Sequence, residues 1–172
     1  MPQIRFSKLA LLAAIAATLC ACAAKPAAES QSGKDQSGKD ETAIRQLLAN
    51  TERRINADDL SFVDAFAKDA VIIAPSAPDI SGYDAIRAMY DGVMKQASMT
   101  VHFSTEEIVP AGDLAYEHGT YTFRMVDRKT GKVLQDVTNK HVHILKRQPD
   151  GSWKTWRMMV NSADAPPAAK DR

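Results

Sequence analysis

Two glycine turns in the second half of the chain constrain its fold more than any other feature. Lys129-Thr130-Gly131-Lys132 and Pro149-Asp150-Gly151-Ser152 each place glycine where a three-residue hairpin loop needs a left-handed residue after a type I turn. Pro149 presets the first turn dihedral, and Asp150 suits the second position. We therefore predict three antiparallel strands between residues 112 and 161, joined by these turns.

The Gly131 turn also predicts which residues of the first two strands lie opposite each other. The expected pairs are Arg128–Lys132, Arg124–Asp136, Thr122–Thr138 and Glu117–His143. Opposite charges and paired threonines are favourable across strands, and a slip by one residue would mix the two faces. One face then carries mostly apolar residues with a few polar ones: Ala115, Glu117, Gly119, Tyr121, Phe123, Met125, Val137, Asn139, His141, His143 and Leu145.

The same turn rule, applied to Gly151, extends this face onto the third strand. It places Thr155, Arg157, Met159 and Asn161 there, with Arg157 beside His143. A mostly apolar face with a few convergent polar groups is the general description of a small-molecule pocket. The expected ligand-binding residues are Tyr121, Asn139, His141 and Arg157.

Glu117 and His143 are the candidate catalytic residues, as an acid–base pair in which the carboxylate orients the imidazole. The alternative is a structural network of Glu117, His143 and Arg157 that satisfies buried polar groups. We favour the network. His141 and His143 put two imidazoles on one face about 7 Å apart along the strand, a spacing that could chelate zinc together with Glu117. The motif is short, so we expect pocket-lining histidines, no metal and no cofactor.

The N-terminus predicts an envelope location. Arg5 and Lys8 precede an apolar run of signal-peptide length, which ends in Leu19-Cys20-Ala21-Cys22 and resembles a bacterial lipobox with Cys22 as the acylated residue. The alternative is ordinary cleavage and a soluble secreted protein. No aspartate follows Cys22, so we expect a periplasm-facing lipoprotein of the outer membrane.

Composition predicts four segments. Residues 1–21 read as the signal, 22–40 as a flexible tether with a repeated Gln-Ser-Gly-Lys-Asp, 41–164 as one domain and 165–172 as a disordered tail. The 22 basic and 21 acidic residues nearly balance and form no basic stripe, so nucleic acid is not expected as a partner. Neither cysteine lies in the domain, which excludes a disulfide or a thiolate metal site there.

The first half of the domain reads as helical, with two short strands. Ile44, Leu48 and Ile55 recur at helical spacing, and Ser61 with Asp64 resembles a capping box that opens a short second helix. Residues 71–73 form a strand, a third helix follows Gly82, and residues 101–109 form another strand. The expected fold is α+β, with about three helices on one face of a curved, mainly antiparallel sheet that forms a cone-shaped barrel.

That order resembles the nuclear transport factor 2-like cone fold, in its SnoaL-like, ketosteroid-isomerase-like branch, much of it of unknown function. The matching segments are Asn56-Ala57-Asp58-Asp59-Leu60, Phe66-Ala67-Lys68-Asp69-Ala70-Val71, Gly82-Tyr83-Asp84-Ala85-Ile86-Arg87, Gly112-Asp113-Leu114-Ala115-Tyr116-Glu117, Gly119-Thr120-Tyr121 and Pro149-Asp150-Gly151-Ser152-Trp153-Lys154. The resemblance places Ala74 where steroid isomerases carry their proton-shuttling Asp, and Asn50 where they carry an oxyanion-holding Tyr. A steroid-isomerase mechanism is therefore not expected.

Three functions remain open. The favoured one is an envelope-anchored protein that binds a small, largely apolar ligand without chemistry. The second is an isomerase, cyclase or hydratase that uses His143 and Glu117. The third is a homodimeric association module, joined through an apolar patch on the other sheet face: Tyr116, Val142, Ile144, Trp156 and Met158.

Overall fold

The computed structural model describes residues 27–163. The chain divides after Lys34, and the fold below is that of the second unit, from Asp35 on. The elements are α1 (Ala27–Asn56), the 3₁₀ helix η1 (Leu60–Ala65), β1 (Phe66–Ile73), β2 (Ile80–Ser81), α2 (Tyr83–Gln96), β3 (Ala97–Ala111), β4 (Leu114–Asp127), β5 (Val133–Arg147) and β6 (Trp153–Ser162). Within this part of the chain, no helix is long and apolar enough to cross a membrane.

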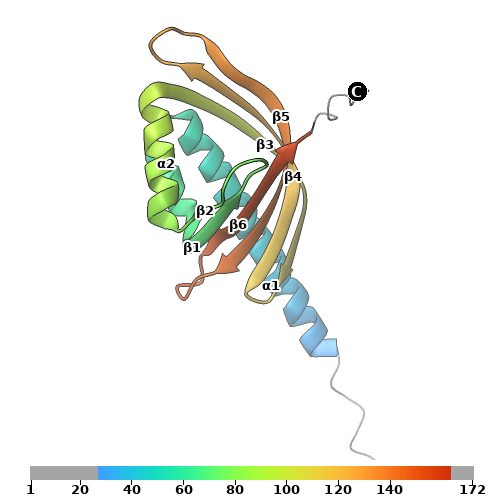
Figure 1. Cartoon of the computed structure of the whole chain (residues 1–172). Helices are drawn as coiled ribbons and strands as arrows, with labels where there is room; N and C mark the ends of the chain where they lie inside the picture. The colour runs from blue at the N-terminus through green and yellow to red at the C-terminus, as the bar shows by residue number, and fades with distance from the viewer. Residues whose placement is uncertain (1–26, 164–172) are drawn as a thin grey trace, which may run out of the picture. The chain divides into compact units, whose positions relative to one another are not determined.

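The strands form one six-stranded sheet in the order β2-β1-β6-β5-β4-β3. β1 and β6 are parallel, and the other neighbours are antiparallel. The sheet curves around the helices, which lie on one of its faces (Figure 1). This confirms the predicted α+β fold. β4 and β5 have partners on both sides, so side chains on them rest on the best-supported part of the sheet.

The predicted tether is wrong from Ala27 on, because α1 begins there and runs through the repeated segment. Its glutamine, lysine and acidic residues are compatible with a helix, and side-chain hydrogen bonds between residues one turn apart stabilise it. Gln36 donates to Asp40 over 3.0 Å, and Asp40 is only 5% exposed. Arg147 and the Trp153 indole also donate to this carboxylate. The signal, Cys22 and the tail from residue 165 lie outside the described residues.

The second helix begins with a cap two residues earlier than the prediction. Asp59 caps η1 by accepting the Ser61 amide over 2.9 Å, so the capping box of Ser61 and Asp64 does not form. Asp64 instead accepts the Tyr83 hydroxyl over 2.6 Å. That bond ties η1 to the start of α2.

The two strands predicted in the first half of the domain are longer than their apolar cores suggested. β1 starts at Phe66, and β3 runs from Ala97 through Pro110 to Ala111. Pro110 has no amide hydrogen to donate. It is tolerated because β3 is an edge strand and has a partner strand on one side only.

Two apolar clusters fill the space between the sheet and the helices. Phe62, Val63, Ile86 and Met99 anchor the one under η1 and α2. Ile44, Leu48, Leu145 and Trp153 anchor the one under α1. β4 contributes to both clusters, with Ala115 in the α1 cluster and Phe123 and Met125 packed on the other. Glu117 therefore lies on β4 between the residues that build the two clusters.

Candidate functional site

The predicted register of β4 and β5 is confirmed through the middle of the hairpin. Glu117 lies opposite His143, and Arg124 lies opposite Asp136. Gly131 adopts the expected left-handed conformation, with φ of 69°. The register shifts by one residue near the turn, where Val126 pairs with Val133. Arg128 therefore does not face Lys132 and forms an ion pair with Asp58.

Arg157 is not part of the site, contrary to the prediction. Leu145 pairs with Thr155 but Ile144 pairs with Arg157, so a bulge at Trp156 moves every later residue of β6 to the opposite face. The Arg157 guanidinium lies 3.8 Å from the centre of the Trp156 ring and donates to a backbone oxygen of β1.

The bulge also changes the residues beside the two histidines. Met158 pairs with His143 and Val160 with His141, in the positions predicted for Arg157 and Met159. Met159 is 52% exposed and belongs to the outer face. The inner face of β6 is thus more apolar at this point than the turn rule predicted.

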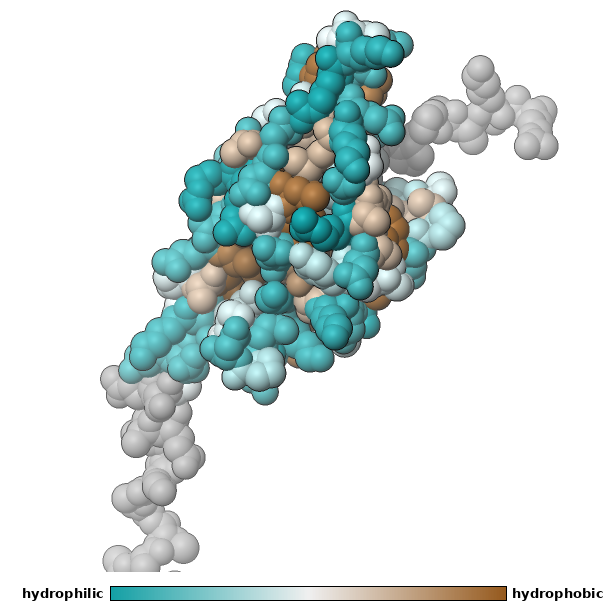
Figure 2. All heavy atoms as spheres, turned by 90° about the vertical axis from the view of Figure 1, so that its left-hand side faces the viewer, coloured by the Kyte–Doolittle hydropathy of each residue, from teal (hydrophilic) through white to brown (hydrophobic). Residues whose placement is uncertain are grey.

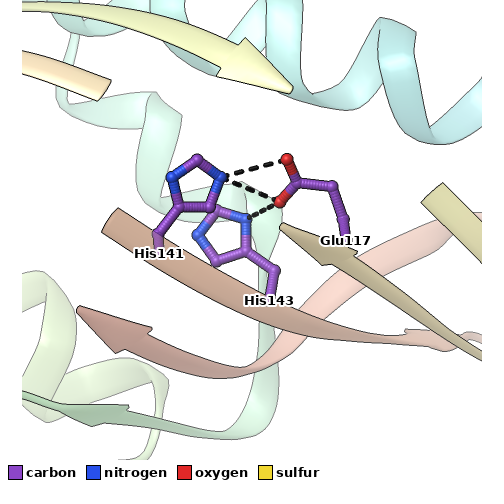
Figure 3. A group of neighbouring side chains, drawn as sticks. All are labelled: Glu117, His141 and His143. Carbon is purple, nitrogen blue, oxygen red and sulfur yellow. Dashed lines mark hydrogen bonds and ion pairs between the residues drawn. The ribbon is translucent and has the colours of Figure 1, made fainter. Parts of the chain in front are cut away.

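Glu117, His141 and His143 form a closed group on β4 and β5 (Figure 3). Glu117 has no exposed surface, and the histidines are 3% and 4% exposed. His141 Nε2 lies 3.0 Å from both carboxylate oxygens. Because an ionised carboxylate only accepts, this contact places a hydrogen on Nε2. His143 Nδ1 lies 2.9 Å from Oε2.

The buried imidazoles are not fully satisfied. Nδ1 of His141 and Nδ1 of His143 are buried without a hydrogen-bond partner. For His143, the nearby Glu117 oxygen is within reach, but the ring is not aligned to donate to it. Most buried polar atoms in proteins have hydrogen-bond partners, so these two nitrogens are exceptions that call for an explanation.

Burial and mutual contact set the charges of the group. Burial alone raises the pKa of Glu117, but the contacts with the two histidines outweigh it and hold that pKa well below its usual range. Burial lowers the pKa of His143, and the neighbouring carboxylate opposes this only in part. Near neutral pH the group therefore holds an ionised Glu117 and a neutral His143.

Two residues of this site lie on β3 and were not predicted. Thr105 donates its hydroxyl to Glu117 Oε1 over 2.9 Å. Phe103 lies edge-on to both imidazoles, with ring centres 5.7 and 6.4 Å from His141 and His143. The alternation from Val101 through Phe103 to Thr105 was a usable signal for both.

Above the buried group, the inner face opens into a half-buried surface. We call it the inner mouth; it consists of Tyr90, Phe103, Tyr121, Phe123, Val137 and Asn139, all partly exposed. Phe103, Tyr121 and Asn139 form one cross-strand row. Asn139 hydrogen-bonds the Tyr121 hydroxyl, and burial of that hydroxyl raises the pKa of Tyr121. Figure 2 shows apolar atoms at the surface on the α2 side of the molecule, framed by hydrophilic ones.

Tyr90 lies at the edge of the apolar cluster under η1 and α2. Its ring packs on Phe62 with centres 4.8 Å apart. Burial raises the pKa of Tyr90, and the charge of Tyr121 adds to this effect. The two phenols therefore lie close together, one from α2 and one from β4.

A separate hollow of about 630 Å³ lies elsewhere, at the start of α2. It is lined by residues that include Asp64, Lys68 and Lys154. None of the predicted site residues lines it, so it is not the predicted ligand site.

The sequence matches one known protein family over most of its length. Residues 26–156 match the SnoaL-like domain. The chain belongs to the SnoaL-like family. Among curated proteins, none matches the sequence of this SnoaL-like protein.

Solved structures with the nuclear transport factor 2-like fold are similar to this SnoaL-like domain. A ketosteroid isomerase-like protein from Erwinia carotovora atroseptica is 20% identical, with a TM-score of 0.60, over 73% of this chain and 95% of that one. A nuclear transport factor 2-like protein from Salmonella enterica is 15% identical, with a TM-score of 0.66, over 78% and 99%. A protein described as a putative aromatic ring hydroxylase from Novosphingobium aromaticivorans is 20% identical, with a TM-score of 0.61, over 74% and 91%. These likenesses show the fold alone.

Proposed function

We propose that this SnoaL-like domain binds a small, largely apolar ligand at the inner mouth and holds it without chemistry. The observation that carries the proposal is the incomplete burial of large side chains that face the helices. Phe103, Tyr121 and Phe123 point inward from the sheet yet remain partly exposed, while residues lower on the same strands are buried. Covering an apolar surface inside a domain with an apolar ligand lowers the free energy.

Polar groups at the inner mouth supply orientation. Tyr121 and Asn139 are hydrogen-bonded to each other at its centre, so a ligand with one polar group could join this pair. His141 lies two residue pairs deeper on the same strands, and Glu117 with His143 lies four pairs deeper. In this proposal they form the polar floor of the site.

An apolar fluorescent probe, 8-anilinonaphthalene-1-sulfonate, tests the proposal on the full chain. We expect Tyr121→Ala and Asn139→Ala to weaken probe binding several-fold, because both residues line the inner mouth. Thr122→Ala and Thr138→Ala are matched controls, since these residues pair on the same strands and face outward. Equal affinity in all four variants would contradict the proposal.

A catalytic role for Glu117 and His143 is the second candidate, and the observation that favours it is their 2.9 Å contact. A neutral imidazole beside an ionised carboxylate is the arrangement a general base needs. An isomerase, cyclase or hydratase substrate would have to reach the 4%-exposed His143 from the inner mouth. Turnover of a candidate substrate that is lost in His143→Ala, while the fold is kept, would support this function over binding alone.

Envelope anchoring through Cys22 belongs to the same proposal. Several acyl chains on one cysteine would hold the domain at a periplasm-facing surface of the outer membrane. A Cys22→Ser variant should leave the membrane fraction. If it partitions with membranes as the wild type does, the anchor is not at this residue.

A homodimer would use the outer sheet face, with the patch corrected for the β6 bulge. Met158 packs inward and the Trp156 indole donates to Asp69, so neither belongs to it. The corrected patch is Tyr116, Val142, Ile144 and Met159, with Val142 and Met159 paired and 39% and 52% exposed. A monomer at high concentration in light scattering would exclude this association.

A further inference from the structure

We infer that Glu117, His141 and His143 bind one divalent transition-metal ion. These three residues are the floor of the proposed ligand site, but the inference does not depend on a ligand being bound there. One carboxylate and two imidazoles are ligands that zinc and its neighbours in the first transition row accept. The candidate ligand atoms of the three residues lie within 4.8 Å of one another.

The separations of the ligand atoms suit a shared ion. His141 Nε2 and His143 Nδ1 lie 3.0 and 2.9 Å from Glu117 oxygens. With metal–ligand bonds of about 2.0–2.1 Å, neighbouring ligand atoms lie about 2.9–3.4 Å apart in octahedral or tetrahedral geometry. Both N–O separations lie in this range, so the two imidazole nitrogens can share an ion with the carboxylate after an adjustment of the side chains.

The unpartnered nitrogen of His143 points to the same conclusion. Its Nδ1 is buried and faces a carboxylate oxygen at 2.9 Å without hydrogen-bond alignment. A ring lone pair and a carboxylate oxygen repel at that distance unless a cation lies between them. A metal ion satisfies both atoms without requiring the alignment of an N–H bond.

Charge supports a cation as well. Arg157, expected beside Glu117, lies on the outer face of the sheet. Within residues 27–163, the ion pairs of Glu117 are with the two histidines alone, and none is with lysine or arginine. A carboxylate that has no exposed surface and no lysine or arginine partner in this part of the chain favours a bound cation.

The scaffold holds these ligands in place before any ion arrives. His141 and His143 are two residues apart on β5, and Glu117 lies directly opposite His143 on β4. Both strands are interior to the sheet. Thr105 fixes the carboxylate from a third strand by its hydrogen bond to Oε1. Ligands oriented in this way by packing and outer hydrogen bonds favour metal binding.

Cobalt provides the test, because its visible absorption reports nitrogen and oxygen ligands directly. The full chain in detergent, stripped with EDTA and dialysed, is titrated with Co²⁺ and then with Zn²⁺. We expect one equivalent of Co²⁺ to produce ligand-field bands and Zn²⁺ to remove them. His141→Ala, His143→Ala and the nearly isosteric Glu117→Gln should each weaken binding at least about 100-fold.

His118→Ala and His102→Ala are the matched controls, since His102 is exposed, His118 is partly exposed, and both form ion pairs with other glutamates. Binding should be unchanged in both. Circular dichroism of each variant shows whether it is folded. Absence of the bands in the wild type overturns the inference whether or not the variants fold. Bands that persist in a His141→Ala/His143→Ala double variant, or that disappear in His118→Ala, overturn it too.

Discussion

Asp40 should anchor α1 to the sheet, and its removal is the sharpest test of the fold. The carboxylate accepts two bonds from the Arg147 guanidinium, at 2.8 and 2.7 Å, and one from the Trp153 indole at 3.3 Å. The guanidinium also stacks 4.4 Å from the centre of the Trp153 ring. We therefore predict that Asp40→Ala separates this end of the helix from β5 and β6.

The expected loss is about 2–3 kcal/mol. Breaking a buried ion pair by removing one partner costs about 3–5 kcal/mol, since the other charge is left uncompensated. Arg147 keeps part of its compensation, because its side chain is 21% exposed and also bonds Asp113. Alanine is the better helix former by about 0.5 kcal/mol, which offsets a little more. For a domain of this size the loss corresponds to about 6–12 °C in Tm.

The effect should also depend on pH. The Arg147 hydrogen bond lowers the pKa of Asp40, so the folded chain holds this carboxylate ionised more strongly than the unfolded chain does. Its contribution is present above an unfolded pKa of about 3.9 and is lost as pH falls through the folded value. The difference between wild type and Asp40→Ala should therefore shrink below about pH 4.

Thermal unfolding followed by circular dichroism measures these differences. Asp35→Ala is the matched control, because Asp35 holds the same place in the first copy of the repeat and is exposed on the same helix. It should change Tm by no more than about 1–2 °C, as surface substitutions do. If Asp40→Ala and Asp35→Ala give the same Tm, Asp40 does not hold α1 to the sheet.

Three further predictions concern the sheet and its site. Gly119→Ala should destabilise the domain by about 1–3 kcal/mol in urea unfolding, because a Cβ there would lie 2.1 Å from the Ser104 carbonyl oxygen; Gly92→Ala, with nothing within 4 Å, should not. The free energy of unfolding should fall as pH drops below about 6.5, since burial lowers the pKa of His143 and the unfolded chain binds that proton first. His143→Gln should remove this part of the pH dependence, and an unchanged profile would contradict the assignment. Met159→Glu should shift a dimer to monomer in scattering at unchanged Tm, and an unaffected dimer would exclude this face.

The sequence was most informative where local geometry decides the structure. A left-handed glycine at position 131 and strict alternation predicted the opposition of Glu117 and His143 correctly. The same rule failed on β6 because one residue, Trp156, bulges out of the alternation. Its indole bonds Asp69, a residue 87 positions earlier, and no local pattern reports such a contact.

The prediction for the start of the domain failed for the same physical reason. A glycine- and serine-containing repeat is a poor helix by composition, so a tether was the natural prediction. Asp40 accepts a hydrogen bond from Arg147, which lies 107 positions later in the chain. This long-range contact stabilises a helix that local preference does not favour. The inner mouth was partly predictable, because Tyr121 and Asn139 follow from register, whereas the approach of Tyr90 depends on how α2 packs.

Native mass spectrometry of the full chain, purified in detergent from the membranes of its own host, tests the central claim most directly. We expect the wild-type chain to carry one small apolar molecule per copy. Tyr121→Ala should lose that molecule and Thr122→Ala should keep it. Wild-type chain without any bound molecule, or a molecule retained equally in Tyr121→Ala, would contradict a ligand site at the inner mouth.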